Sequence, residues 1–189
     1  MGEQPAICEM GVDWDKDAER AAKEPYPYTE VRYFEYFKEF IKPNVRVLEV
    51  GCQIGSWYPA WKGLEPTVKY EGLDFSSVAI KIARQRYPEC KFHLMNAKQM
   101  NFKEEFDVVF THTFLQHTSI QLKEKVMPLI WKALKKDGLL IAQENTACES
   151  LGTWFKEGWI GFIEKFGFQT VKTHDIGGGG TGFVFRKSA

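Results

Sequence analysis

The sequence predicts an α/β fold, a three-layer sandwich in which a mostly parallel seven-stranded sheet lies between two layers of helices. Three observations support this prediction. Short apolar runs alternate with segments of helical periodicity, which implies parallel strands joined by helical crossovers. A glycine-containing turn follows the first apolar run, where such sheets bind ligands. The last two apolar runs have no helix between them, so one strand near the C-terminus should run antiparallel.

The first half of the chain alternates helices with short buried strands. Residues 45–50 are rich in branched apolar side chains and predict the first strand. Ser76 is placed to cap the helix after the second strand. We expect strands at 45–50, 68–73, 91–95 and 106–111, and helices at 28–41, 57–61 and 76–86. The inward face of the last of these helices should carry Val78, Ile82 and Ala83.

The second half of the chain predicts two more helices and three more strands. A helix over 120–135 should end at Asp137-Gly138, because glycine commonly follows a helix C-terminus. A second helix over 154–166 should end at Gly167. Strands are expected at 139–143, 168–174 and 182–186, the last two joined by Gly177–Gly180. The helix over 120–135 has one apolar face, formed by Leu122, Val126, Leu129, Ile130, Ala133 and Leu134.

The chain divides into a polar arm and one domain. Residues 1–27 are acidic and interrupted by prolines, which predicts an irregular arm with at most a short helix over 15–23. A length of 189 residues suits a single hydrophobic core. We therefore predict one domain over residues 28–189.

Composition argues against several classes of function. Lys plus Arg equals Asp plus Glu at 25 each, so the basic excess typical of a nucleic-acid binder is missing. The four cysteines form no C-x-x-C pair, which argues against a disulfide framework and a zinc site. No apolar run matches a membrane span, and the N-terminus does not resemble a signal peptide. We expect a cytoplasmic protein that binds neither nucleic acid nor membranes, and leave its oligomeric state open.

The turn after the first strand has features of a ligand site. Gly51 permits a tight turn and a close approach of ligand to backbone, and Gly55 allows close packing where the next helix begins. Glu49 places a carboxylate beside the turn, which would repel a phosphate and attract a cationic ammonium. Asp74 ends the second strand, where an acid can accept both hydroxyls of a ribose. This pair of features predicts a nucleoside-containing ligand.

Five segments, in the right order over residues 45–145, resemble the motifs of class I (Rossmann-like) S-adenosylmethionine-dependent methyltransferases. The glycine turn has the spacing of their first motif, E-x-G-x-G-x-G, with the middle glycine replaced. The resemblance implies that fold, methyltransferase activity and S-adenosyl-L-methionine as cofactor. The segments are Val47-Leu48-Glu49-Val50-Gly51-Cys52, Gly72-Leu73-Asp74-Phe75-Ser76, Met95-Asn96-Ala97, Phe106-Asp107-Val108-Val109-Phe110 with Leu115-Gln116-His117, and Leu134-Lys135-Lys136-Asp137-Gly138-Leu139-Leu140.

The resemblance also assigns roles to individual residues. Glu49 and the backbone near Gly51 would hold the methionine part of the cofactor, with Thr111 beside it. Asp74 would accept the ribose hydroxyls, with Phe75 against the adenine. The adenine edge would meet Asn96 and Ala97. The complete set of expected cofactor residues is Glu49, Gly51, Gln53, Gly55, Asp74, Phe75, Asn96, Ala97 and Thr111.

Two residues depart from the family pattern. Gln53 replaces a glycine, so the loop has less conformational freedom and the side chain must either contact the cofactor or point away. Asn96 replaces the usual aspartate; its amide oxygen can still accept a hydrogen bond from the adenine amino group, but without a charge. We interpret both as changes in affinity or detail, although an inactive relative with this fold stays an alternative.

Methyl transfer from a sulfonium needs mainly alignment, and a base only when the acceptor must lose a proton. His117, just beyond the fourth strand, is the best candidate for that base, because histidine titrates near neutral pH. His112 is a second candidate. A structural role, as a capping or packing residue, is the alternative for each. We expect no metal site, because no ligand spacing stands out.

Other residues are weaker candidates for the pocket. The helix before the first strand could fold over the cofactor, and the resemblance makes Tyr28, Arg32 and Tyr33 plausible lid residues; packing on the sheet is the favoured alternative. Trp57 either lines the methionine end or anchors the next helix. Glu144-Asn145, past the fifth strand, either borders the acceptor pocket or is an ordinary polar loop.

The leading interpretation is an enzyme that methylates an oxygen or nitrogen atom of a small-molecule acceptor. The chain carries almost nothing beyond the expected fold that would recognise a large polymer. A protein or peptide N-methyltransferase is a second interpretation, since acidic residues at 9–24 would attract a cationic tail. A non-catalytic cofactor-binding subunit is a third, favoured by Gln53 and Asn96. A dehydrogenase, which would bind a nicotinamide cofactor, is the last.

Overall fold

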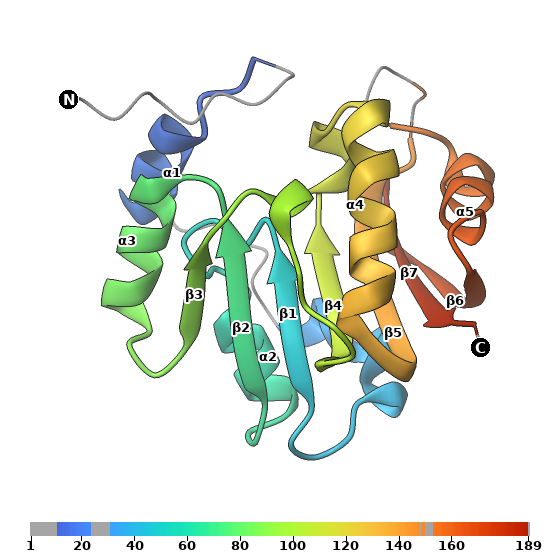
Figure 1. Ribbon diagram of the computed structural model, residues 1–189, viewed down its shortest axis with the longest axis horizontal. Coiled ribbons are helices and arrows are strands. Elements are labelled where there is room, and N and C mark those ends of the chain that lie inside the picture. The colour runs from blue at the N-terminus through green and yellow to red at the C-terminus, as the bar shows by residue number, and fades with distance from the viewer. Residues whose placement is uncertain (1–10, 24–30, 148, 150–152, 189) are drawn as a thin grey trace.

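The computed structural model describes residues 11–23, 31–147, 149 and 153–188, and shows a three-layer α/β sandwich (Figure 1). The predicted fold class is confirmed: a seven-stranded sheet is mostly parallel and has its antiparallel part near the C-terminus. Several features considered above lie outside the described residues: the boundary of the arm after residue 27, Tyr28, Cys8, Cys148 and the side chain of Arg32.

Every predicted strand is present. The strands are β1 (Arg46–Val50), β2 (Lys69–Asp74), β3 (Lys91–Leu94), β4 (Phe106–His112), β5 (Leu134–Asn145), β6 (Phe168–Gly177) and β7 (Gly180–Lys187). The α-helices are α1 (Trp14–Lys23), α2 (Tyr58–Leu64), α3 (Ser77–Arg86), α4 (Ile120–Ala133) and α5 (Lys156–Glu164), and the 3₁₀ helices are η1 (Val31–Phe40), η2 (Ala97–Gln99) and η3 (Leu115–His117).

The strand order is β3-β2-β1-β4-β5-β7-β6. The chain moves from β1 outward to β2 and β3, and then returns to place β4 on the other side of β1. This reversal between β1 and β4 is where open α/β sheets bind ligands, beyond the carboxyl ends of the strands. Only β7 runs against its neighbours, pairing antiparallel with β5 and β6. A connection too short for a crossover joins it to β6, which explains its direction.

One face of the sheet is covered by η1, α2 and α3. Aromatic residues fill this layer, with Phe34, Phe37 and Trp61 fully buried against Phe110 of β4. The helix predicted over 28–41 is a 3₁₀ helix where it is described. Its aromatic residues explain the type, because Phe34, Phe37 and Phe40 recur every third position and a 3₁₀ helix aligns such positions on one side.

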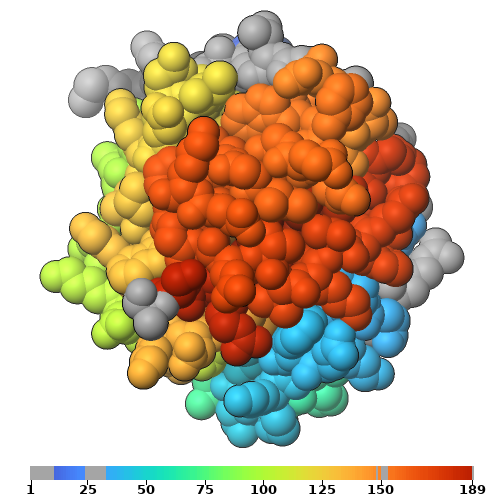
Figure 2. Space-filling view, turned by 90° about the vertical axis from the view of Figure 1, so that its right-hand side faces the viewer, coloured from blue at the N-terminus to red at the C-terminus, as the bar shows by residue number. Residues whose placement is uncertain are grey.

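The opposite face is covered by α4 and α5. Val126, Met127 and Ile130 of α4 pack with Trp159 of α5 against the sheet, and all four are fully buried. Seen from the β6 edge, α5 and the β6–β7 hairpin cover most of the surface, with the segment around η1 beneath them (Figure 2). Among the described residues, no helix has the length and apolarity needed to cross a membrane.

Several helix boundaries and one helix face differ from the predictions; α2, for example, runs to Leu64 rather than to residue 61. Helix α4 ends at Ala133 rather than near Asp137, and Leu134 already belongs to β5. The last carbonyl groups of α4 explain this end: those of Lys132 and Ala133 accept from the backbone N–H groups of Glu104 and Glu105. Helix α5 spans nine residues, short of the predicted 154–166.

The inward face of α3 is also shifted by one position. Ala79, Ile80 and Ala83 are buried, whereas Val78 and Ile82 are half-buried and pack against α1. The predicted cap is confirmed: Ser76 Oγ accepts from Ala79 N at 3.0 Å. The predicted face differs because α1 buries a second apolar edge of α3, and no local sequence pattern places α1 there.

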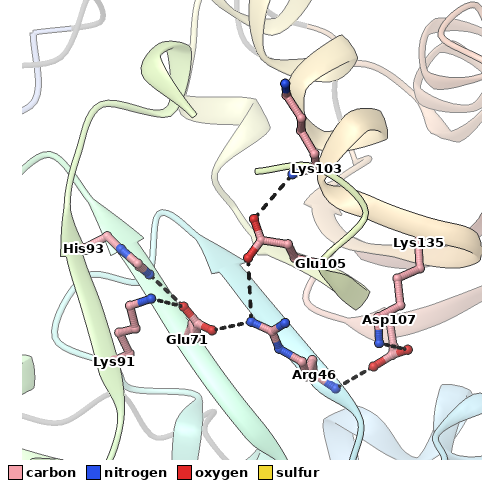
Figure 3. Close-up of polar contacts among 8 residues, drawn as sticks. All are labelled: Arg46, Glu71, Lys91, His93, Lys103, Glu105, Asp107 and Lys135. Carbon is pink, nitrogen blue, oxygen red and sulfur yellow. Dashed lines mark hydrogen bonds and ion pairs between the residues drawn. The ribbon is translucent and has the colours of Figure 1, made fainter. Parts of the chain in front are cut away.

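Between β3 and β4 the chain forms only η2, so no helix among the described residues covers the lower part of β1–β3 on the α4 side. A polar network occupies this area (Figure 3). Glu71 accepts from Arg46 at 2.9 Å and contacts His93 at 2.8 Å, so polar side chains from three neighbouring strands meet there. The contact with His93 is the main reason that the pKa of Glu71 is lowered to about 2. His93 is thus a strand residue with a structural partner.

Candidate functional site

A cavity of about 650 Å³ opens at the carboxyl ends of β1–β4. The loops after these four strands and helix α1 form its walls. Its position matches the predicted ligand site. Eight of the ten residues nominated from the sequence line it: Glu49, Gly51, Gln53, Asp74, Phe75, Asn96, Ala97 and His117. Gly55 and Thr111 do not.

The loop after β1 needs both of its glycines, for different reasons. Gly51 has φ +78°, and a Cβ there would lie 2.7 Å from the Phe114 ring. Its N–H donates to the carbonyl of Leu73 at 2.9 Å, which ties the loop to the end of β2. Gly55, with φ +74°, lies outside the cavity because it packs under Tyr87 and Phe92. The predicted packing role of Gly55 therefore fits, whereas direct ligand contact does not.

Gln53 adopts a left-handed backbone conformation, with φ +49°, at the position where the family prefers glycine. Its backbone N–H donates to Asp74 Oδ2 at 2.9 Å. Its side-chain amide donates to the carboxylate of Asp17 in α1. The residue that breaks the motif thus keeps the glycine-like backbone and uses its side chain to hold α1 over the loop.

Glu49 is a buried carboxylate at the edge of the cavity. It is 1 % exposed and accepts a hydrogen bond from the Tyr70 hydroxyl. Burial raises the pKa of Glu49 to about 8; the Tyr70 hydrogen bond opposes the rise and the Asp74 charge adds to it. A cation placed beside this carboxylate would favour its ionised form. The site is therefore suited chemically to a ligand ammonium group.

Asp74 is held by the backbone around it. Its Oδ1 accepts from Ser76 N and its Oδ2 from Gln53 N, both at 2.9 Å. Burial raises its pKa despite these hydrogen bonds, which act in the opposite direction. Each carboxylate oxygen has two acceptor positions, so both oxygens can still accept from hydroxyl groups. The hydrogen bonds fix the orientation that such a contact would need.

The contacts of Asn96 explain why asparagine can replace the aspartate of the family pattern. Its Oδ1 accepts from Lys98 N at 3.2 Å and caps η2. Asparagine and aspartate serve equally well as helix caps, so the substitution keeps the turn. Ala97, the next residue, and Phe75 also line the cavity.

Thr111 does not face the cavity, contrary to the prediction. Glu49 pairs with Phe110, and alternate residues of a strand point to opposite faces, so Thr111 points away from Glu49. Its hydroxyl lies 3.4 Å from Glu144 Oε1. The neighbouring residue, His112, points toward the cavity instead.

Glu144 and Asn145 are likewise outside the cavity lining, so neither interpretation given above describes them fully. Glu144 accepts from the backbone N–H groups of Leu115 at 3.2 Å and Gln116 at 3.0 Å. Asn145 N donates to Gln116 Oε1 at 2.7 Å. Both residues therefore position the η3 turn that carries His117.

Aromatic rings surround the far end of the cavity. The Trp57 ring lies 4.5 Å from the His112 ring and stacks on Phe34, so it both lines the cavity and anchors α2. The Trp14 ring meets His117 edge-on at 5.4 Å. Tyr33 touches Trp57 but is not part of the cavity wall. This supports the packing interpretation of η1 for the one predicted lid residue whose side chain is described.

Helix α1 supplies the residues that the sequence did not nominate. Trp14, Asp17 and Arg20 line the cavity, and Ser76 Oγ donates to Asp15. A short helix over 15–23 was expected, but its position was not. The sequence does show Trp14 together with acidic residues such as Asp15 and Asp17 in the polar arm. No local pattern, however, connects Asp17 to its partner Gln53, 36 positions further along the chain. No group of side chains suited to a metal ion occurs in the described part of the chain.

Comparisons with known proteins agree with this geometry. Residues 47–138 match the family model of a methyltransferase domain. The chain is 26 % identical over 100 residues to a malonyl-[acyl-carrier protein] O-methyltransferase of Bacillus cereus, a match covering 52 % of this chain and 36 % of the relative. The matches cover 60 % and 36 % of the lengths of the two curated relatives, so the chain spans less than two thirds of each.

Two solved structures share the fold. A putative methyltransferase of Bacillus halodurans superposes with a TM-score of 0.70 at 17 % identity, covering 84 % of this chain and 98 % of the other. The [4+2]-cyclase SpnF superposes with a TM-score of 0.78 at 15 % identity, covering 100 % and 99 %. The family match spans the strands and loops that build the cavity. Residues 47–138 thus form a methyltransferase domain, and the chain is similar in sequence motifs and fold to the class I (Rossmann-like) S-adenosylmethionine-dependent methyltransferases.

Proposed function

We propose that the chain transfers a methyl group from S-adenosyl-L-methionine to an oxygen or nitrogen atom of a small-molecule acceptor. The observation that supports this most is Glu49, a buried carboxylate on the cavity wall; burial raises its pKa, and a cation beside it would favour its ionised form. A cofactor with an ammonium group would supply that cation. A phosphate-containing dinucleotide would place negative charge beside it, which counts against the dehydrogenase alternative.

The other expected residues fit the rest of the cofactor. Asp74 would accept the ribose hydroxyls through the free acceptor positions of its oriented carboxylate. Phe75, Asn96 and Ala97 line the wall where the adenine would lie. Gln53 would act through its hold on α1. Gly55 and Thr111 would act indirectly, Gly55 by packing the loop and Thr111 by contacting Glu144.

The cofactor supplies an activated methyl group, so the protein's part is mainly alignment. The acceptor would approach from the end of the cavity lined by Trp57, His112, Phe114 and His117. His117, the base expected from the sequence, is at this end, and burial lowers its pKa, which favours the neutral imidazole. His112 is there as well.

The size of the cavity supports a small acceptor. Its volume of about 650 Å³ lies within the range for one drug-sized ligand, and the cofactor would fill much of it. Helix α1 forms a further wall, which counts against a peptide chain passing through. The O-methyltransferase among the relatives favours oxygen over nitrogen. The two described cysteines, Cys52 and Cys90, are free thiols, which supports the cytoplasm as the proposed compartment.

A second candidate is a protein that binds the cofactor without transferring its methyl group. The specific observation in its favour is the fold shared with the [4+2]-cyclase SpnF. The departures at Gln53 and Asn96 also favoured it, but the structure explains both by hydrogen bonds that keep the loop shape. Methyl transfer is therefore preferred.

Calorimetry with S-adenosyl-L-methionine and S-adenosyl-L-homocysteine tests the proposal. We expect both to bind, and we expect Glu49→Gln to weaken binding by roughly 10- to 100-fold, the effect of losing a hydrogen bond to a charged group. Glu71→Gln makes the same substitution at a carboxylate outside the cavity and should leave affinity unchanged. Absence of binding at millimolar cofactor would exclude both the enzymatic and the cofactor-binding candidates, and binding of NADH instead would revive the dehydrogenase.

A further inference from the structure

Two histidines at the acceptor end of the cavity differ in what they offer a ligand. His112 is the last residue of β4, and His117 is the last residue of η3. Burial lowers the pKa of both, so each imidazole is neutral near pH 7. A neutral imidazole has one N–H donor and one lone pair, and its hydrogen-bond partners decide which nitrogen carries which.

Gln143 fixes the tautomer of His112. The two residues pair directly between β4 and β5. The Gln143 amide nitrogen donates to the carbonyl oxygen of Tyr33 at 3.1 Å, and a carbonyl oxygen can only accept. The Gln143 amide oxygen therefore faces His112 Nδ1, at 3.0 Å. It follows that Nδ1 carries the proton and that the lone pair of His112 is on Nε2.

This lone pair is available to a ligand. Within the described ranges, no residue forms a hydrogen bond with His112 Nε2. The ring lines the cavity and packs against Trp57, whose indole holds it from one side. Gln143 itself is 1 % exposed, and the hydroxyl of buried Tyr36 lies 3.5 Å from its amide nitrogen. His112 is thus a preorganised acceptor of a proton.

Gln116 has the opposite effect on His117, because it faces the lone pair of the imidazole and leaves the N–H group for a ligand. The Gln116 amide oxygen accepts from Asn145 N at 2.7 Å, so its amide nitrogen is the atom that faces His117 Nε2, at 3.5 Å. An amide nitrogen can only donate, so the lone pair of His117 is directed at Gln116. His117 is left with Nδ1–H as the group that it can offer a ligand.

We propose that His112, rather than His117, is the base for methyl transfer, and that His117 donates a hydrogen bond that orients the acceptor. This inference rests on the proposed function. In the step, a lone pair of the acceptor atom forms a bond to the methyl carbon, and the carbon–sulfur bond breaks with its electrons remaining on sulfur. The proton of the acceptor passes to His112 Nε2, which later releases it to water.

The arrangement defines a class of acceptor. The acceptor molecule would present an O–H group to His112 and a hydrogen-bond acceptor, such as a carbonyl oxygen, to His117. The rings of Trp14, Trp57 and Phe114 around this end suit a flat molecule. A buried imidazole is a weak base, so it suits an acidic phenol better than an aliphatic alcohol. The isomers of hydroxyacetophenone are simple probes of this class, and their hydroxymethyl analogues are matched alcohols.

The tautomers can be measured without an acceptor, by long-range ¹H–¹⁵N NMR of protein with ¹⁵N-labelled histidine. At pH 7 we expect His112 to be protonated at Nδ1 only. Gln143→Leu should give a mixture of its two tautomers, whereas Gln99→Leu, an exposed change in η2, should not. A wild-type His112 protonated at Nε2 would overturn the proposal, whatever calorimetry shows about the cofactor.

Kinetics test the roles, with release of S-adenosyl-L-homocysteine as the readout. His112→Ala should lower kcat for the hydroxyacetophenones by roughly 10²- to 10⁴-fold, and added imidazole should restore part of it. His117→Asn should mainly raise KM, by roughly tenfold. Cofactor affinity should stay unchanged in both variants. A larger loss of kcat in His117→Asn would return the base to that residue, and no turnover of any isomer by cofactor-bound protein would refute the acceptor class.

Discussion

At the residue scale, Glu49 links cofactor binding to pH. Burial raises its pKa to about 8 in the free protein, so the carboxyl group is largely protonated at pH 6. Binding an ammonium group would require the ionised form and release the proton. We therefore expect cofactor affinity to rise from pH 6 to 7.5, by up to roughly tenfold per pH unit. Calorimetry in buffers of different ionisation enthalpy would measure both the affinity and the proton released.

The variant Glu49→Gln separates this effect from other titrations. Glutamine can still accept from the Tyr70 hydroxyl but cannot ionise, so the dependence on pH should become nearly flat in this range. If the wild-type affinity were also flat between pH 6 and 7.5, Glu49 would not be the partner of the ammonium group.

Gly51 gives a second prediction at this scale. Alanine there would be strained at φ +78°, and its Cβ would lie 2.7 Å from the Phe114 ring. We expect Gly51→Ala to lower the free energy of unfolding by about 1–3 kcal/mol and to weaken cofactor binding. Chemical denaturation measures the first effect, and calorimetry the second.

Two further variants make that test specific. Phe114→Ala added to Gly51→Ala should recover the steric part of the loss but not the backbone strain. Gly161→Ala, in α5 with nothing near the new methyl group, should be neutral or stabilising. If Gly51→Ala and Gly161→Ala lowered the free energy of unfolding equally, neither the Phe114 contact nor the backbone strain at Gly51 would matter.

Some of the residues that the sequence patterns nominated line the cavity because the local backbone fixes their positions. Gly51, Asp74 and Asn96 lie at strand ends or caps, where a few neighbouring letters determine the geometry. Thr111 lies outside the cavity wall, because the motif identifies the strand but not the face on which a side chain lies. Counting alternate residues from Phe110, which pairs with Glu49, would have selected His112 instead.

At the scale of elements, α1 is fastened to the loops that it covers. Gln53 donates to Asp17, and Ser76 donates to Asp15, so two separate strand ends hold the same helix. Gln53→Gly would keep the left-handed loop conformation and remove one of these hydrogen bonds. We expect amide hydrogen exchange in α1 (Trp14–Lys23) to become several-fold faster.

The comparison variant for this prediction is Gln99→Gly, an exposed glutamine of η2 that is not part of the cavity wall. It should leave exchange in α1 unchanged. Unaltered exchange in Gln53→Gly would show that packing against α3 alone holds the helix, and Gln53 would then have no role in covering the site.

Helix ends were harder to predict than helices. Leu134 continues the apolar spacing of α4, yet it pairs with Phe106 in the sheet. A buried leucine satisfies either element, so periodicity could not separate them. The deciding interactions are the hydrogen bonds from Glu104 and Glu105, about 30 residues away in the chain, to the last carbonyl groups of the helix.

At the scale of the whole molecule, the fold was predictable because local signals agree with it. Short strands alternate with helices, and the missing helix between β6 and β7 determines the antiparallel strand. What could not be predicted depends on contacts between distant segments. The position of α1 and the pairing of His112 with Gln143 arise only when the sheet brings β1, β4 and β5 together.

Buried carboxyl groups at the end of the sheet should make the stability of the whole protein depend on pH. Burial raises the pKa of Glu49 and of Glu144 to about 8, above the value near 4.5 of an unfolded chain. The folded state therefore binds more protons than the unfolded state between these values. Such groups stabilise the fold fully below pH 4.5, and this contribution is lost as pH rises through 8.

The window from pH 7 to 7.5 isolates this effect best. The pKa of His112 is lowered to about 4, so it is mostly neutral in both states there, and the pKa of Lys123 is lowered only to about 8, so it stays largely protonated. We expect the free energy of unfolding, from urea titrations, to fall steadily across this window. Glu49→Gln should reduce the slope, and Glu71→Gln, at a carboxylate with a pKa of about 2, should not. Stability that rises with pH here would mean that the buried carboxyl groups are already ionised in the free protein.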